Sequence, residues 1–277
     1  MLPEAHTSVF GFAYDISATY PRSSMTPACS VRARLVAFAC ACLGLWAGSI
    51  QAQEPRLANV STLSRVGTGT DVLTAGFYIT GTAPKRVVIR GVGPTLASAP
   101  FNVTGVLANP TLTVFGPNSS TLVAATNDDW NAADAPTFAS VGAFPLLPNS
   151  RDAAIVTTLA PGAYTAQVSG IGGTTGIAIV EVYEVGITAS TFVNLSTRAQ
   201  VGGNAGILMP GFVVTPGGGT RKLLIRAAGP ALTPLGVQGA LTNPNISLLK
   251  VGSPSVTVAS NDDWQTPTGI GTASAAT

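Results

Sequence analysis

Hydrophobic and polar residues alternate along short segments of this chain. Within residues 163–169, positions 164, 166 and 168 are apolar, whereas 165, 167 and 169 are polar. A period of two places one set of side chains on a core and the other in water, which is typical of β-strands. Similar segments, bounded by Gly, Pro and Asn, predict eight strands, at 58–64, 72–80, 86–92, 111–115, 122–126, 154–159, 163–169 and 177–183. Only residues 132–139 suggest a weak helical turn.

The composition agrees with an all-β protein. Gly (31) and Pro (20) are abundant in the 277 residues, and only 9% are charged, which favours many turns over coiled coils or helix bundles. A hydrophobic content of 46% is enough to fill a core and argues against disorder. We therefore predict an antiparallel β-sandwich of jelly-roll or immunoglobulin-like topology. The net charge of +2 gives no electrostatic footprint for nucleic acid.

An internal repeat with a period of about 135 residues organises the chain. Residues 57–130 recur at 192–264. The matching motifs keep their order, with gaps of only a residue or two between them. They pair Asn59–Thr62 with Asn194–Thr197, Gly76–Phe77 with Gly211–Phe212, residues 85–90 with 221–226, Gly93–Pro94 with Gly229–Pro230, and Asn127–Trp130 with Asn261–Trp264.

The repeat predicts three parts. Residues 1–53 form an N-terminal extension with a signal peptide, residues 54–190 a first β-sandwich repeat, and residues 191–277 a second, incomplete repeat. The first repeat is large enough to fold alone, and the short link at 185–191 predicts that the two modules lie close together. The first copy continues through Tyr183, and nothing after Thr277 corresponds to that part. We expect a fragment of a longer protein, the alternative being a truncated gene, since half a sandwich exposes sheet edges.

The N-terminal extension has the pattern of a secretory signal peptide. Arg32 and Arg34 precede an apolar run over residues 35–50, and small residues before Gln53 predict cleavage after Ala52. An uncleaved membrane anchor is the alternative, although a spanning helix needs ~20 apolar residues. We therefore predict a secreted, extracellular or cell-surface protein without a membrane span in its mature chain.

The mature chain contains neither Cys nor His, because all three cysteines and His6 lie in the extension. Disulfides, thiol nucleophiles, Ser-His-Asp triads and His- or Cys-based metal sites are therefore absent from it. Glu181 and Glu184 lie three residues apart on a strand and do not face one another, and no Gly-x-Ser-x-Gly elbow or phosphate loop occurs. The sequence thus predicts a protein that is not an enzyme.

Two further segments carry a family resemblance. One runs from the strand at 110–115 through Asn127-Asp128-Asp129, and the other joins Ser150-Arg151-Asp152 to the strand at 163–169 through Pro161-Gly162. Over residues 110–183 this pattern resembles bacterial pre-peptidase C-terminal modules. The whole unit is also similar to tandem repeats in large bacterial surface proteins. The resemblance implies a secreted, non-catalytic β-sandwich module, of a kind often attached to extracellular hydrolases.

The repeated Asn-Asp-Asp segment is the main candidate for a site. Ca²⁺ prefers several oxygen ligands, which carboxylates and amides at the end of a strand can offer. The residues concerned are Asn127, Asp128, Asp129, Asn261, Asp262 and Asp263. The other interpretation is that these side chains bond backbone N–H groups and shape a turn. The resemblance adds that related modules occasionally bind Ca²⁺; no other cofactor is predicted.

Trp130 and Trp264 follow these segments and are the only tryptophans of the mature chain. Exposed, they would form platforms for stacking on a sugar ring; buried, they would cap the end of the sandwich. The conserved spacing of basic residues at 85–90 and 221–226 allows a basic stripe, but charges on an edge strand more often keep that edge soluble. We expect Arg90 to pair with a carboxylate such as Asp152.

These patterns leave three hypotheses for function. The first is a structural or adhesive interaction module on the cell surface, with another surface protein or a polysaccharide as partner. The alternative is a carbohydrate-binding accessory module of a larger extracellular hydrolase. The third is a secreted enzyme whose catalytic part lies outside this sequence. Exposure of Trp130 beside Asp128 would favour sugar binding, and its burial would favour the structural role.

Overall fold

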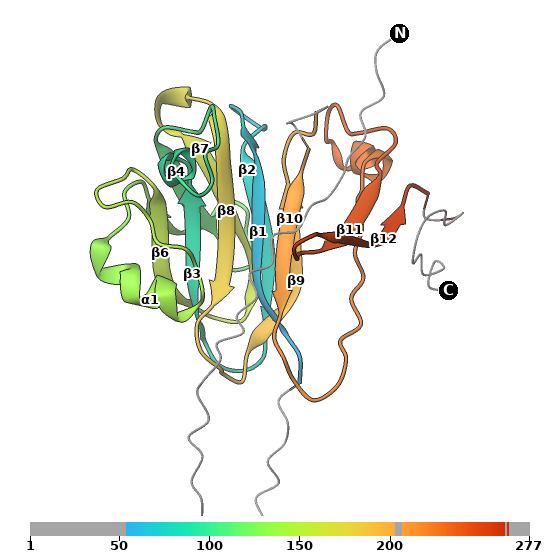
Figure 1. Cartoon of the computed structure of the whole chain (residues 1–277), viewed down its shortest axis with the longest axis horizontal. Helices are drawn as coiled ribbons and strands as arrows, with labels where there is room; N and C mark the ends of the chain where they lie inside the picture. Colours follow the sequence, from blue (N-terminus) through green and yellow to red (C-terminus); the bar gives the residue numbers. More distant parts are fainter. Residues whose placement is uncertain (1–53, 203–206, 264, 266–277) are drawn as a thin grey trace, which may run out of the picture.

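The computed structural model describes residues 54–202, 207–263 and 265. The predicted signal peptide and Trp264 lie outside the described residues. Ten strands form a single sheet (Figure 1). Across this sheet the order is β5 (Val123–Asn127), β4 (Pro110–Phe115), β7 (Gly162–Gly170), β2 (Leu73–Thr80), β9 (Thr191–Arg198), β1 (Leu57–Val66), β8 (Gly176–Glu184), β3 (Lys85–Val92) and β6 (Ala153–Leu159), and β10 (Met209–Val214) also pairs with β1.

The sheet curls until it is nearly closed like a barrel. Every pair of neighbouring strands in it is antiparallel, and the end strands β5 and β6 lie against one another. The strands β11 (Ile246–Lys250) and β12 (Val256–Asn261) form a separate two-stranded sheet. The predicted all-β class is therefore confirmed.

In the part of the chain that the structure describes, helices are few and short. They are η1 (Pro94–Ala97), η2 (Ala132–Asp134), α1 (Ala135–Ser140), η3 (Ile171–Gly173) and η5 (Pro230–Leu235). The helical turn predicted at 132–139 is confirmed as η2 and α1. Among the described residues, no helix has both the length and the apolar character needed to cross a bilayer.

All eight predicted strands are present as β1 to β8, with ends that differ by at most two residues. The alternation explains this agreement. On β7 the side chains of Tyr164, Ala166 and Val168 are buried, and those between them are partly exposed. Their neighbours on β2 follow the same rule, since Leu73, Ala75, Phe77 and Ile79 are all buried. These residues line the main core inside the curled sheet.

A second, smaller core lies on the outer face of β3, β6 and β8. There Val88, Ala154 and Tyr183 pack against Leu96 of η1 and Phe138 of α1. This layer buries β3 on both faces. The expectation that charges on this strand protect a free edge is wrong, because β3 pairs with β8 on one side and with β6 on the other.

Local backbone geometry agrees between the two sequence copies where both are described. Gly93 precedes η1 with φ −128° and ψ −68°, and Gly229 precedes η5 with φ −124° and ψ −75°. In both, an added Cβ would overlap a carbonyl oxygen, that of Leu107 or of Leu241. The hairpins also agree, since the ladder of β4 with β5 and that of β11 with β12 share their register and a bulge at the same step.

Candidate functional site

The Asn-Asp-Asp segment begins at the last residue of β5, Asn127. Both the oxygen and the nitrogen of the Asn127 side-chain amide form hydrogen bonds. Its Oδ1 accepts a hydrogen bond from Ala154 N–H at 2.9 Å, and its Nδ2 donates to the carbonyl of Asp129 at 2.8 Å. In the second copy the Asn261 amide donates to the carbonyl of Asp263 at 3.1 Å. The amides thus hold this turn, and in the first copy they also attach it to β6.

The carboxylates of this segment lie at the surface. Asp128 and Asp129 are exposed, as are Asp262 and Asp263. Over the described ranges, no group of three or more Asp, Glu, His or Cys side chains is close enough to hold a metal ion. The contacts observed belong to a turn, and the Ca²⁺ site stays a prediction.

Trp130 is half-buried and packs at the edge of the outer core. Its indole Nε1 donates to Ser150 Oγ at 3.1 Å, and its ring lies 6.0 Å from that of Phe138. Its backbone N–H donates to the carbonyl of Asp152 at 2.8 Å. The indole N–H, the group that would bond a sugar hydroxyl, is therefore already paired within the protein.

Arg90 is fully buried, and its partner is Glu181 of β8 rather than the expected Asp152. Its Nε and Nη2 donate to Glu181 Oε2 at 2.8 and 2.5 Å. Its Nη1 donates to the carbonyl of Phe144 at 2.7 Å. The guanidinium also lies 4.4 Å from the centre of the Phe144 ring. A buried charge needs this degree of pairing, so Arg90 fixes β3, β8 and the covering loop together.

Tyr183 completes this cluster. Its hydroxyl donates to Glu181 Oε1 at 2.8 Å. Burial raises the pKa of Tyr183 well above its ordinary value, and the negative charge of Glu181 raises it further, while Arg90 acts in the opposite direction. The phenol therefore stays neutral over the physiological range and serves as a fixed donor.

Asp152 positions a different loop. Its carboxylate accepts hydrogen bonds from Gly93 N–H at 2.8 Å, Thr95 N–H at 3.2 Å and Ser150 Oγ at 2.6 Å, as well as from the Thr95 hydroxyl. Four donors saturate this buried group and tie η1 to the start of β6. Like Glu181, Asp152 is thus committed to holding the fold.

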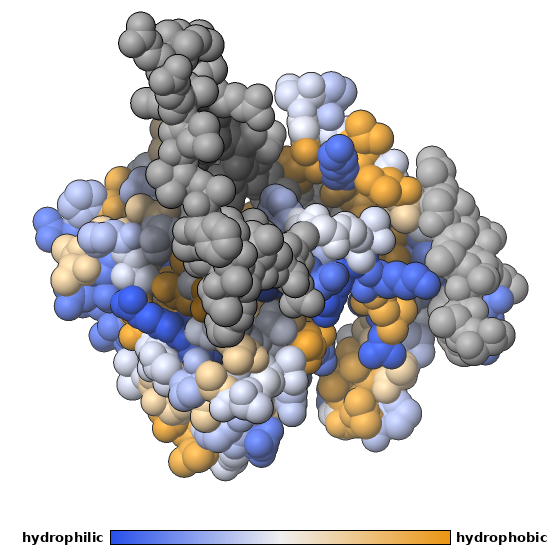
Figure 2. Space-filling view, turned by 90° about the horizontal axis from the view of Figure 1, so that it is seen from below, coloured by the Kyte–Doolittle hydropathy of each residue, from blue (hydrophilic) through white to orange (hydrophobic). Residues whose placement is uncertain are grey.

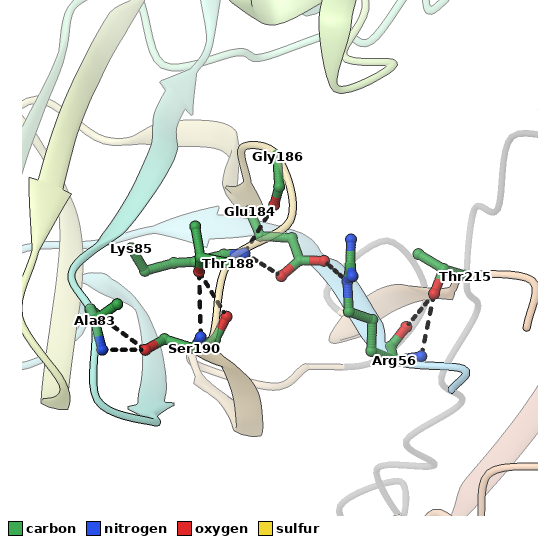
Figure 3. Close-up of polar contacts among 8 residues, drawn as sticks. All are labelled: Arg56, Ala83, Lys85, Glu184, Gly186, Thr188, Ser190 and Thr215. Carbon is green, nitrogen blue, oxygen red and sulfur yellow. Dashed lines mark hydrogen bonds and ion pairs between the residues drawn. The ribbon is translucent and has the colours of Figure 1, made fainter. Parts of the chain in front are cut away.

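A third polar cluster holds the segment 185–190, which connects the two sequence copies (Figure 3). The Glu184 carboxylate contacts Lys85 Nζ at 2.9 Å and also pairs with Arg56 Nε. Lys85, which is fully buried, donates as well to the carbonyl of Gly186 at 2.8 Å. One carboxylate therefore fixes the end of β8, the start of β3 and the residue before β1.

The rest of this segment is attached by hydroxyl groups. Ser190 Oγ accepts from Ala83 N–H at 3.1 Å and donates to the Ala83 carbonyl at 2.5 Å.

A further contact attaches the end of β10 to the residue before β1. Thr215, just after β10, accepts from Arg56 N–H at 3.1 Å through its hydroxyl and donates its own N–H to the Arg56 carbonyl at 2.8 Å (Figure 3). We call these contacts, together with strands β1, β2, β9 and β10, the junction.

The strands of the junction exchange partners between the two copies. β9 and β10 match β1 and β2 in sequence, yet β9 pairs with β2 and β10 pairs with β1. The two ladders have equivalent registers, since Gly76 faces Ser196 and Phe77 faces Leu195, while Gly211 faces Ser61 and Phe212 faces Val60. Each copy thus supplies its first strand to the second strand of the other.

Phe192 anchors this exchange. It belongs to β9 in the second copy, but it is fully buried in the main core and meets Phe77 of β2 edge to face at 5.7 Å. Sequence reasoning found the repeat and the short link, but not the crossed pairing. The match of Asn194–Thr197 to a strand of the first copy does predict a strand here. It does not indicate which strand this one pairs with.

No match to the chain is found among protein-family models, curated proteins or solved structures. The resemblance to pre-peptidase C-terminal modules therefore stays a prediction.

Proposed function

We propose that this protein is a non-catalytic, secreted or cell-surface module of β-sandwich type with a structural role. It would act as a stiff spacer or interaction module, in which successive sequence copies share their sheets. The crossed pairing of β9 with β2 and of β10 with β1 is the observation that supports this proposal most strongly. Modules that share strands cannot rotate freely about their link, in contrast to domains joined by a flexible linker.

The polar groups of the molecule support the same role. The buried carboxylates of Asp152, Glu181 and Glu184 are each held by donors or cations of the protein. Groups that are poised for catalysis are instead aimed at a place where substrate can bind. These interactions fix loops and strands relative to one another, as a spacer requires.

The carbohydrate-binding alternative receives less support. It needs a free aromatic face with polar partners, whereas the Trp130 indole bonds Ser150 and packs near Phe138. A sugar array probed with the wild type and with Trp130→Ala would test it. We expect no signal from either protein, and a signal lost in the variant would support sugar binding.

Stiffness can be measured directly because the mature chain lacks cysteine. Spin labels at Ala139→Cys on α1 and Leu235→Cys on η5 would report the distance between the two copies by pulsed electron resonance. Both positions are exposed. We expect one narrow distance distribution, which Phe192→Ala should broaden. A broad distribution in the otherwise unmodified chain would contradict the proposed spacer.

A further inference from the structure

The strand ladders of the junction are related by a two-fold symmetry. The ladder of β1 with β10 and that of β2 with β9 join the same positions of the two copies, and both shift register at the same step, next to Asn59 or Asn194. Exchange of the two copies would therefore leave both ladders unchanged. The equivalent pairs are Asn59–Val213 and Asn194–Tyr78, Val60–Phe212 and Leu195–Phe77, Ser61–Gly211 and Ser196–Gly76, Thr62–Pro210 and Thr197–Ala75, and Leu57–Val214 and Phe192–Ile79.

One residue pair lies on the axis of this symmetry. Leu57 of β1 pairs with Phe192 of β9, and the two residues occupy the same position in the two sequence copies. Both are buried in the main core, against which Phe77 of the first copy and Phe212 of the second also pack. An interface in which a residue meets its own counterpart is isologous, like the interface of a symmetric homodimer.

Each half of this interface uses a pattern that both copies carry. In both ladders a serine of the first strand lies opposite a glycine of the second, since Ser61 faces Gly211 and Ser196 faces Gly76. A Cβ at Gly76 would come within 2.5 Å of Ser196 Oγ, so the approach of the two strands requires this glycine. Because both copies hold the same serine and glycine, the first strand of either copy fits the second strand of another.

The link between the copies runs over the surface. β8 ends at the lower side of Figure 1, and Figure 2, which views the molecule from that side, shows hydrophilic and hydrophobic residues mixed on the surface there. Residues 186–189 are exposed, and Val185 is partly buried. The length of the link can therefore be changed with little loss of packing.

This link decides which copy is taken as partner. β1 lies between β8 and β9 in the sheet, so residues 185–190 span two strand spacings, about 9.5 Å. A short link gives the two parts that it joins an effective concentration in the millimolar range. A dilute molecule therefore pairs its own two copies, although the ladders themselves fit those of another molecule equally well.

We propose that the junction is a homotypic interface and that its partner is a second molecule of this chain. In the exchanged dimer, β9 and β10 of each molecule pair with β2 and β1 of the other, and the ladder contacts of the junction are kept. Exchange of an identical element between protomers is a low-cost route to dimers. The inference rests on the proposed function, because it extends sheet sharing from two copies of one chain to two separate chains.

Shortening of the link tests the proposal. Deletion of residues 185–189 from the chain 54–277 leaves Glu184 joined to Thr191 through Ser190 alone, a reach of at most about 7 Å. β9 then cannot lie beside β2 of the same molecule, because that position is two strand spacings from β8. We expect a dimer by static light scattering. A monomer, whether folded or unfolded, would overturn the proposal.

The matched control keeps the length of the link. Replacement of residues 185–189 by five glycine and serine residues removes the same side chains, including that of Val185, but preserves the reach of a flexible chain. This variant should be a monomer at the concentration at which the deletion variant is a dimer. A dimer in both would mean that the altered side chains cause the association, and would contradict the exchange.

Single cysteines identify the strands that pair in the dimer. Two deletion variants, one with Tyr78→Cys and a size tag and the other with Asn194→Cys, are refolded together and oxidised. Tyr78 faces Asn194 across the ladder of β2 with β9, so a disulfide should join one molecule of each kind. The product should be lost when Ser196→Cys, diagonal to Tyr78, replaces Asn194→Cys. Equal yields from the two mixtures, or no product from either, would overturn the proposal.

The spin-label distances in the chain with its natural link separate this inference from the proposed spacer. A narrow distance distribution together with a monomeric deletion variant would keep the spacer and remove the exchange. A broad distribution together with a dimeric, crosslinked deletion variant would do the reverse.

Discussion

Replacement of Phe192 by alanine tests how strongly the second copy is built into the core of the first. This side chain of β9 is fully buried in the main core, next to Phe77 of β2. Truncation of a buried Phe to Ala costs about 3–5 kcal/mol in lost burial and residual cavity. For a folded unit of 150–250 residues, this loss of stability corresponds to a fall in melting temperature of about 6–20 °C.

The assay is urea unfolding of residues 54–277 carrying Trp264→Phe, followed by tryptophan fluorescence, because the remaining Trp130 lies in the first copy, far from β9 in sequence. Val193→Ala is the matched control: this neighbour on the same strand is 46% exposed, so its truncation should change the free energy of unfolding by no more than about 0.5 kcal/mol. If Phe192→Ala shifts the Trp130 transition no more than Val193→Ala does, β9 is not part of this core, and the crossed pairing is refuted.

Three other changes address separate parts of the account. Gly93→Ala should lower the free energy of unfolding by about 1–3 kcal/mol, measured by urea titration, because its Cβ would overlap the Leu107 carbonyl; an unchanged midpoint would contradict the close approach. The pKa of Tyr183 is raised in the folded protein, so the contribution of this tyrosine to stability is complete below its ordinary pKa of 10.0 and is lost as the pH rises above that value, because the unfolded chain ionises first. Between pH 8 and 11 the free energy of unfolding should therefore fall less steeply in Tyr183→Phe than in the wild type. Identical slopes would exclude this tyrosine as the cause. Because the Asn-Asp-Asp amides hold a turn, we expect equal melting temperatures in EDTA and in millimolar Ca²⁺; a rise that Asp128→Ala,Asp129→Ala abolishes would establish the metal site instead.

Local features of the fold could be predicted from the sequence, and long-range ones could not. β7 can be predicted because its apolar residues alternate and the turn residues Pro161-Gly162 mark its start. β3 is harder, because its two faces are buried by different layers, one of which comes from α1 and η1. No pattern within residues 85–92 predicts that a helix 40 or more residues later in the chain covers this strand.

The same limit applies to the site. The repeat and its Asn-Asp-Asp segments can be read from the sequence, but the hydrogen bond between Asn127 and β6 depends on how distant strands are arranged. Arg90 was expected to find a carboxylate, and the choice of Glu181 over Asp152 follows from the order of β3 and β8. The crossed pairing of β9 was hidden for a further reason, since both copies present similar strands and sequence alone does not say which one pairs with which.

An engineered disulfide tests the crossed pairing most directly. Residues 54–277 contain no cysteine, and Tyr78 of β2 faces Asn194 of β9, both exposed. Tyr78→Cys with Asn194→Cys should therefore oxidise within one molecule, because directly opposed residues lie within disulfide reach. Tyr78→Cys with Ser196→Cys is the control, since this diagonal pair is about 7–8 Å apart and should stay reduced. Equal oxidation of both pairs, or a crosslink only between molecules, would contradict the shared sheet.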